Sequence, residues 1–210
     1  MRAIFIDTET TGLPPRDRTI TPDKVKGAWP DLVSLSWLIS LDEKIITAQS
    51  HIIKPNGWTI GDGAIQKHGI SNELAAAEGV PLKTVFATFL DDLKTADIMI
   101  MYNVEFDKNV LLNALLYHIG MTLEETLNVW PKHEFCPMEL SRSICKLPLA
   151  NPRPPFLYKS PTLKELYEHT FKYAPPPSFL HTSLGDTMIL HAVFFKHWTL
   201  SFASKYIPWR

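Results

Sequence analysis

The chain has 210 residues, 45% of them hydrophobic and 20% charged, which is typical of one well-buried globular domain; we expect a single domain over residues 1–210. The formal net charge of -1 excludes a strongly basic nucleic-acid-binding coat, although a local basic groove is compatible with it. The two cysteines, Cys136 and Cys145, lie in no CxxC motif. The sequence shows no signal-peptide pattern, and no apolar run approaches the ~18 residues of a membrane span. We therefore expect a cytoplasmic protein without membrane contact.

The first predicted element is a short apolar strand, Arg2–Ile6, which suits a strand buried on both faces. The segment Asp7–Leu13 follows as a turn. Asp7 and Glu9 are two residues apart, so on an extended chain both carboxylates point into the same cleft. Two like charges held this close repel each other unless a cation lies between them. The alternative is that these residues only start a turn that Gly12 completes.

The remaining pattern alternates strands and helices. Leu32–Leu41 and Ile45–Ile53 resemble an antiparallel hairpin around a polar turn. Further strands are expected at Ile98–Tyr102 and Glu134–Pro137, helices at Leu82–Ala96, Phe106–Ile119, Thr162–Phe171 and Ser183–Trp198 and in the segments Gly57–Ser71 and Pro137–Lys146, and a proline-rich loop at Leu147–Pro161. This order predicts an α/β domain built around a mixed sheet.

A second acidic position follows the Ile98–Tyr102 strand, where Asp107 stands in the first turn of the next helix. If that strand lies beside the first strand, Asp107 reaches the same end of the sheet, where α/β proteins place their sites. A purely structural interpretation is also open. Asn103 is a good N-cap, and acidic residues in a first helical turn complement the helix dipole.

The third position is the start of the last long helix, where His181 and Asp186 flank Thr182-Ser183-Leu184-Gly185. Ser183 followed three residues later by Asp186 resembles a capping box, and a histidine beside a helix start is often structural. Each position taken alone therefore has a structural explanation.

Taken together, the three positions resemble the three motifs of the DEDDh (DnaQ-like) 3′–5′ exonuclease family, a group of the ribonuclease H-like superfamily. The segments that carry the resemblance are Phe5–Leu13 (FIDTETTGL), Asn103–Asp107 (NVEFD) and His181 five residues before Asp186. His68-Gly69-Ile70 is similar to a short motif that the family carries between the first two sites. The resemblance covers nearly the whole chain and implies a ribonuclease H-like mixed central sheet flanked by helices.

The resemblance also implies a reaction and its cofactors. Two divalent cations, Mg²⁺ or Mn²⁺, are expected, because hard oxygen ligands suit these ions. Asp7 is expected to bridge both ions, Glu9 and Asp186 to complete one, and Asp107 to support the other. His181 is the expected general base, since an unperturbed histidine pKa near ~6.5 suits that task. The expected product is a nucleoside 5′-monophosphate removed from a 3′ end.

The substrate of this reaction is expected to be the 3′ end of single-stranded or frayed DNA. The expected substrate-binding residues are Thr10, Leu13, His68, Asn103 and Phe106. Leu13 corresponds to a wedge against the terminal base, and Phe106 has either a stacking or a core role. Stacking and backbone contacts bind single strands with little sequence preference. The basic residues between Arg142 and Lys172 are a candidate strand-tracking surface, with a merely solvated face as the alternative.

Three other interpretations of the sequence stay open. The substrate could be RNA, as in an oligoribonuclease, because no residue reports on a 2′-hydroxyl contact. The chain could also be a non-catalytic nucleic-acid-binding or polymerase-accessory module that kept the fold. The aromatic-rich tail Phe194–Trp209 could dock a replication partner such as a polymerase, or a second copy in a homodimer, although several of its aromatic residues are expected to complete the core.

Overall fold

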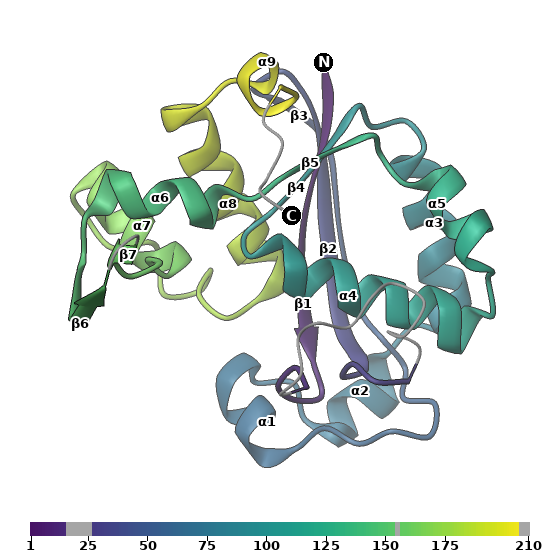
Figure 1. The fold of residues 1–210 in the computed structure, drawn as a ribbon. Coiled ribbons are helices and arrows are strands. Elements are labelled where there is room, and N and C mark those ends of the chain that lie inside the picture. The colour runs from purple at the N-terminus through teal and green to yellow at the C-terminus, as the bar shows by residue number, and fades with distance from the viewer. Residues whose placement is uncertain (16–26, 154–155, 206–210) are drawn as a thin grey trace.

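The computed structural model describes residues 1–15, 27–153 and 156–205. Its centre is a 5-stranded mixed sheet with the strand order β3-β2-β1-β4-β5 (Figure 1). The strands are β1 (Arg2–Thr10), β2 (Leu32–Leu41), β3 (Lys44–Ile52), β4 (Ile98–Met101) and β5 (His133–Phe135). β1, β2 and β3 pair antiparallel, whereas β4 and β5 run parallel to β1. The predicted α/β mixed sheet flanked by helices is confirmed.

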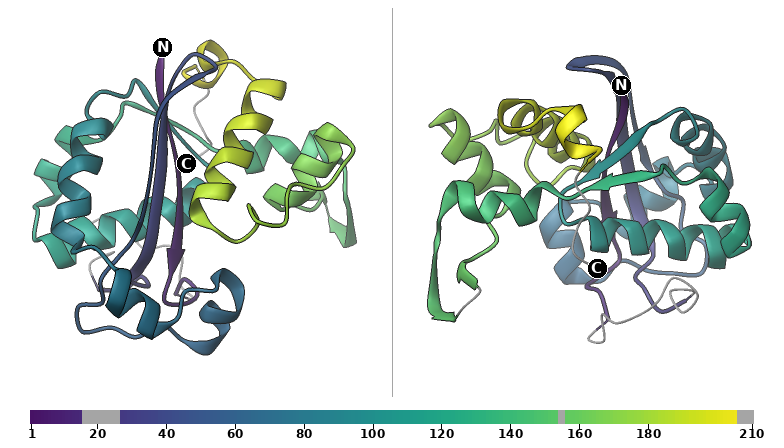
Figure 2. Two further views of the ribbon diagram at one scale, coloured as in Figure 1. Left: turned by 180° about the vertical axis from the view of Figure 1, so that it is seen from behind. Right: turned by 45° about the horizontal axis from the view of Figure 1, so that its top comes forward.

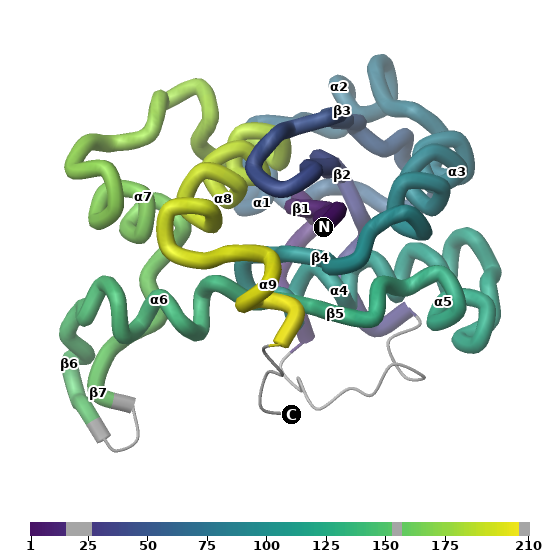
Figure 3. Tube along the Cα trace, turned by 90° about the horizontal axis from the view of Figure 1, so that it is seen from above, coloured from purple at the N-terminus to yellow at the C-terminus, as the bar shows by residue number. Residues whose placement is uncertain are grey.

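Helices cover both faces of this sheet (Figures 2 and 3). One layer consists of α3 (Leu82–Leu93), α4 (Val104–Asn113), the π-helix η2 (Ala114–Ile119) and α5 (Leu123–Val129). The other layer consists of α6 (Pro137–Cys145), α7 (Leu163–Phe171), α8 (Ser183–His197) and α9 (Leu200–Ala203). Two short helices, α1 (Asp62–His68) and α2 (Asn72–Glu78), lie beyond the end of β1, and a small hairpin of β6 (Pro148–Arg153) and β7 (Phe156–Tyr158) projects from the second layer (Figure 1).

The apolar residues of β1 serve both layers, as a doubly buried strand requires. Ile4 and Ile6 join the cluster under α3 and α4, whereas Ala3 and Phe5 join the cluster under α8. Among the described residues of the aromatic-rich tail, Phe194 and Trp198 are buried in this second cluster. Full burial of a side chain of this size contributes roughly 1.5–3 kcal/mol. The two cores hold β1 at the centre of the molecule.

The structure differs from the sequence-based prediction in where β1 ends. Asp7 and Glu9 belong to the strand, which continues to Thr10, and the predicted turn begins later. The reason is β2, which pairs with every residue of β1 from Arg2 to Thr10 and so keeps the chain extended. A register shift between Glu9 and Thr10 marks where regular pairing stops.

Smaller elements escaped prediction. α2 and α5 are only 7 residues long each and lie where no helix was expected. The helix expected at Phe106–Ile119 is α4 followed by a π-helical segment, η2. The expected proline-rich loop contains the β6–β7 hairpin. Within the part of the chain that the structure describes, no helix is long and apolar enough to cross a membrane.

Candidate active site

The carboxylates predicted from separate motifs meet at one end of the sheet. Asp7 and Glu9 lie two residues apart on β1 and therefore share a face of the strand. β4 runs parallel to β1 directly beside it, so the helix that follows β4 begins at the same end and brings Asp107 there. Asp186 arrives from the first turn of α8, which packs across β1 and β2. We refer to Asp7, Glu9, Asp107 and Asp186 as the carboxylate cluster.

Three members of this cluster could hold a metal ion as they stand. One ligand oxygen from each of Asp7, Glu9 and Asp186 lies within 4.8 Å of the other two. Hard carboxylate oxygens are the ligands that Mg²⁺, Mn²⁺ and Ca²⁺ prefer. The donor chemistry and the convergence of the three groups therefore fit a divalent cation.

Asp107 is held by a different set of contacts. Its side chain is only 3% exposed, and its Oδ1 accepts hydrogen bonds from the Thr8 amide at 3.1 Å and from the Thr8 hydroxyl at 2.7 Å. Thr8 lies between Asp7 and Glu9, so these bonds tie α4 to the acidic end of β1. Asn103 occupies the N-cap position of α4, as predicted, but its side chain forms no capping hydrogen bond, and it adopts a left-handed conformation with φ of 71°.

Burial raises the pKa of each carboxyl group in the cluster, and repulsion from neighbouring carboxylates raises the pKa of Asp7 and Glu9 further. The pKa of Asp7 rises well above its usual value because the group is buried and because Asp107, Asp186 and Glu9 lie nearby. Burial is the largest cause for the other three as well, and it raises the pKa of Glu9 and of Asp107 to about 7 and that of Asp186 to about 6. Perturbed acids gathered in one place are typical of functional sites.

The start of α8 is anchored to the sheet by hydroxyl groups. Thr182 is the N-cap, and its side chain accepts a hydrogen bond from the Gly185 amide. The predicted capping box of Ser183 and Asp186 is therefore wrong. The Ser183 hydroxyl instead lies 2.8 Å from the Ser34 hydroxyl and 2.7 Å from the Ser36 hydroxyl on β2. These contacts leave the Asp186 carboxylate available to the cluster.

His181 lies immediately before this cap, in a left-handed conformation with φ of 61° and an exposed side chain. Its charge and its backbone amide both lower the pKa of Asp186, which places the residue next to the cluster. The loop before it is packed tightly against α8, because a Cβ atom on Gly185 would lie 2.0 Å from the Phe179 carbonyl oxygen. Only glycine allows this approach.

A cavity of about 540 Å³ opens beside the cluster. All five predicted substrate-binding residues line it, together with Glu9, Trp29 and Lys67. Leu13 is 90% exposed, as suits a residue that contacts a ligand, and Phe106 packs against Trp29 with ring centroids 5.8 Å apart. Phe106 therefore both lines the cavity and joins the core.

Two of these predicted residues also have structural roles. The Thr10 hydroxyl donates a hydrogen bond to the Gly12 carbonyl at 2.8 Å, which shapes the turn after β1. The buried His68 accepts a hydrogen bond from the Ile70 amide at its Nδ1, which fixes the turn after α1.

Sequence analysis missed Lys67. This exposed lysine lines the cavity, and its charge lowers the pKa of all four members of the carboxylate cluster. Its position directly before the His68-Gly69-Ile70 motif was the signal available. This position did not identify Lys67 as a site residue, because no sequence pattern shows that α1 packs near the end of β1.

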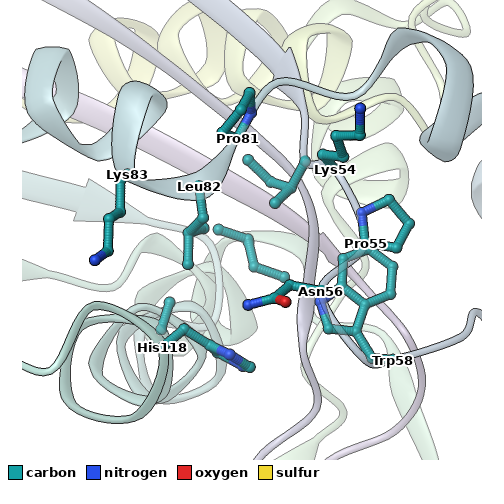
Figure 4. A pocket seen from close by; sticks show the side chains of 11 residues that line it. Lys54, Pro55, Asn56, Trp58, Pro81, Leu82, Lys83 and His118 are labelled. Carbon is teal, nitrogen blue, oxygen red and sulfur yellow. The ribbon is translucent and has the colours of Figure 1, made fainter.

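A second cavity, of about 330 Å³, lies away from the cluster between the loop after β3, the start of α3 and η2 (Figure 4). Lys54, Lys83 and His118 line it, but the amino groups of the two lysines end far apart (Figure 4). His118 is engaged with Asp31 at 2.6 Å. None of the described residues that line this cavity is a carboxylate, whereas Glu9 of the carboxylate cluster lines the first cavity.

Comparison with known proteins shows the fold. No family model and no curated protein sequence matches the chain. Among solved structures, exonuclease X in complex with 5′ overhanging duplex DNA is similar over 96% of this chain and 97% of that one, with 21% identity and a TM-score of 0.60. E. coli exonuclease I in complex with a dT13 oligonucleotide is similar over 91% of this chain, with 17% identity and a TM-score of 0.63.

Exonuclease I from Methylocaldum szegediense gives a similar result, with 16% identity and a TM-score of 0.64. The chain spans only 39% and 40% of these two exonuclease I chains. At these identities the likeness establishes a shared fold, and the predicted resemblance to the exonuclease fold is confirmed at that level.

Proposed function

We propose that this chain, which has the fold of exonuclease X and exonuclease I, is a DEDDh-type, metal-dependent 3′–5′ exonuclease acting on single-stranded or frayed DNA. The observation that carries the proposal is the convergence of the carboxylate cluster and His181 from three distant segments onto one end of the sheet. Repulsion among buried acids destabilises a fold, so a cluster of this kind is favoured where a cation binds.

Asp7, Glu9 and Asp186 would hold one divalent cation, and Asp7 and Asp107 would hold a second. Bound Mg²⁺ or Mn²⁺ neutralises phosphate charge, aligns a water and assists the leaving oxygen. The protein keeps these ligands in place through the bonds from Thr8 to Asp107 and from Ser183 to β2.

His181 is the proposed general base. It is exposed, and its backbone amide and its charge both act on the Asp186 carboxylate, so we expect its imidazole to reach a water that attacks a phosphate bound at the cluster. Its imidazole takes a proton from that water as the water oxygen bonds to phosphorus and the phosphorus–O3′ bond breaks. The leaving O3′ takes up a proton from solvent and becomes the 3′-hydroxyl of the shortened strand, and the imidazolium gives its proton back to solvent. The released product is a nucleoside 5′-monophosphate.

The cavity supports a chain terminus as the substrate. Its lining combines the exposed Leu13 with the Phe106 ring, which suits one unstacked base. The 330 Å³ cavity is lined by lysines but offers no carboxylate, so it does not compete for this role.

We also propose a compartment and a contact surface for a protein partner. Cys136 and Cys145 are buried free thiols, in keeping with the cytoplasm. Phe202, at the described end of the aromatic-rich tail, is 48% exposed and is the residue we favour for contact with a second copy or a polymerase. Tyr206 and Trp209 lie outside the described residues.

The test is product analysis on 5′-labelled single-stranded DNA and matching RNA, with Mg²⁺, Mn²⁺ or EDTA. We expect a ladder that shortens from the 3′ end, that requires metal, and that is faster on DNA. Asp7→Asn, which removes a charge without changing side-chain size, is expected to abolish the ladder. Faster shortening of the RNA would show that RNA, not DNA, is the preferred substrate. Strands that bind the protein but stay intact would show that the chain is a non-catalytic nucleic-acid-binding module.

A further inference from the structure

Lys67 lies on a small platform that is fixed to the active site. α1, which carries it, begins at Gly61, whose amide bonds to the Thr11 carbonyl at 3.4 Å. Ile60, which lies just before α1, is held by the Asn72 side chain. The Asn72 Oδ1 accepts a hydrogen bond from the Ile60 amide at 2.8 Å, and the Asn72 Nδ2 donates one to the Ile60 carbonyl at 3.1 Å. Ile60 and Ile70, which bracket α1, are both buried in one small apolar cluster. Lys67 is therefore presented to the cavity by a rigid element.

Lys67 lines the same cavity as Glu9, and among the described residues its amino group forms no ion pair with an N–O distance of 4.0 Å or less. Its charge nevertheless reaches every carboxylate of the cluster, and it is the largest charge effect on Glu9. Lys67 and Glu9 therefore share one cavity without a direct bond between them.

A lysine in this position has opposite effects on the two things that the site is proposed to bind. Its positive charge repels a divalent cation and attracts a phosphate. A lysine whose purpose was only to neutralise the acids would bond to one of them directly. An ammonium that lines the cavity of about 540 Å³ and forms no ion pair among the described residues is instead suited to a backbone phosphate.

We propose that Lys67 is a positioning residue that binds a phosphate group of the nucleic-acid strand beside the 3′-terminal nucleotide. The proposal rests on the exonuclease function proposed above. It assigns to α1 a contact with the substrate that is separate from the metal ligands and from His181. No bond is made or broken at Lys67.

The test compares the Lys67→Gln variant with a control variant, Lys83→Gln. Lys83 is an exposed lysine on α3 that lines the other cavity. Binding of a fluorescein-labelled (dT) oligonucleotide is measured by anisotropy in Ca²⁺, a hard cation with looser ligand geometry than Mg²⁺. We expect Lys67→Gln to weaken binding several-fold and to reduce the slope of log K against log salt by about 0.7, the value for one phosphate on a single strand. Lys83→Gln should match the wild type, and Lys67→Arg should restore most of the affinity.

Calorimetric titration of Mn²⁺ into the protein without DNA gives a second readout. Because a repelling charge is removed, Lys67→Gln is expected to bind Mn²⁺ about threefold to tenfold more tightly. A merely structural lysine would not weaken DNA binding while strengthening metal binding. Equal DNA binding by Lys67→Gln and Lys83→Gln would overturn the proposal alone, whereas a wild type that binds no oligonucleotide would overturn the exonuclease function and this proposal together.

Discussion

The two charged regions of this molecule handle their charges in opposite ways. In the carboxylate cluster, like charges are gathered at buried or half-buried positions and have no direct cationic partner among the described residues. In the arm formed by residues 137–172, which carries the β6–β7 hairpin, charges are mostly paired. Lys159 bonds to Glu165 at 2.5 Å, and Arg142 and Lys164 each lie near a glutamate.

The difference separates stability from function. Paired charges on an exposed arm stabilise the local structure slightly and need no ligand. Buried like charges destabilise the fold until a cation arrives, so they persist where binding matters. The basic residues of the arm are also weaker candidates for a strand-tracking surface than their number suggests, because several are already engaged.

The largest effect that would sharpen this comparison is expected at His181. His181→Ala should lower kcat by about 10²–10⁴, the usual contribution of a positioned general base, without a change in thermal stability, because the side chain is exposed. Steady-state kinetics and thermal melts provide the measurement. His169→Ala, an exposed histidine of the arm, is the matched control and should keep the wild-type rate. A fully active His181→Ala variant would remove the general base from the mechanism.

The next effect is expected at Gly185. A methyl group there would lie 2.0 Å from the Phe179 carbonyl oxygen, so Gly185→Ala must push the loop that carries His181 away from α8. We expect a loss of about 1–3 kcal/mol in the free energy of unfolding, as for other overpacked sites, and a reduced kcat. Chemical denaturation measures the first. Gly63→Ala, with open space around its Cβ, is the control and should not lose stability; an equally stable Gly185→Ala variant would contradict the tight packing.

The pH dependence of stability tests the cluster itself. Its carboxyl groups have folded-state pKa values above the usual values of 3.8 and 4.5, reaching about 7 for Glu9 and Asp107. The folded state therefore holds more protons than the unfolded state between those values. The stability that these groups contribute is complete below about pH 4 and is lost as the pH rises through about 7.

Partly buried histidines, such as His191, have lowered pKa values and change the stability with the opposite sign. The comparison of the wild type with Asp7→Asn in EDTA isolates the cluster. We expect Asp7→Asn to be the more stable protein at pH 8, with little difference at pH 4, and each kcal/mol to shift Tm by about 2–4 °C. Mg²⁺ should raise the Tm of the wild type at pH 8 and have a smaller effect on the variant. If the wild type is more stable than Asp7→Asn at pH 8 without metal, then repulsion among the carboxylates does not destabilise the fold.

Sequence reasoning located the carboxylate cluster because its motifs are local and chemically distinctive. Asp7 and Glu9 were placed on one face by their spacing alone, and Asp107 joined them on the condition that two strands are neighbours. The resemblance to the DEDDh motifs added Asp186. It could not locate Lys67, whose role depends on how a short helix packs beyond the sheet. It also took Ser183 for part of a cap, because hydroxyl groups serve caps and tertiary contacts equally well and only the position of β2 decides between them.

The smallest effect is expected in the arm. The side chains of Lys159 and Glu165 are 41% and 32% exposed, so solvent screens their attraction even though Lys159 is the largest cause of the lowered pKa of Glu165. A double-mutant cycle of Lys159→Ala and Glu165→Ala should give a coupling of about 0.2–1 kcal/mol that declines with added salt. The same Lys159→Ala variant should bind the oligonucleotide like the wild type. If it instead weakens binding as strongly as Lys67→Gln, then the arm contacts the strand, and its ion pairs are exchanged for phosphates when DNA arrives.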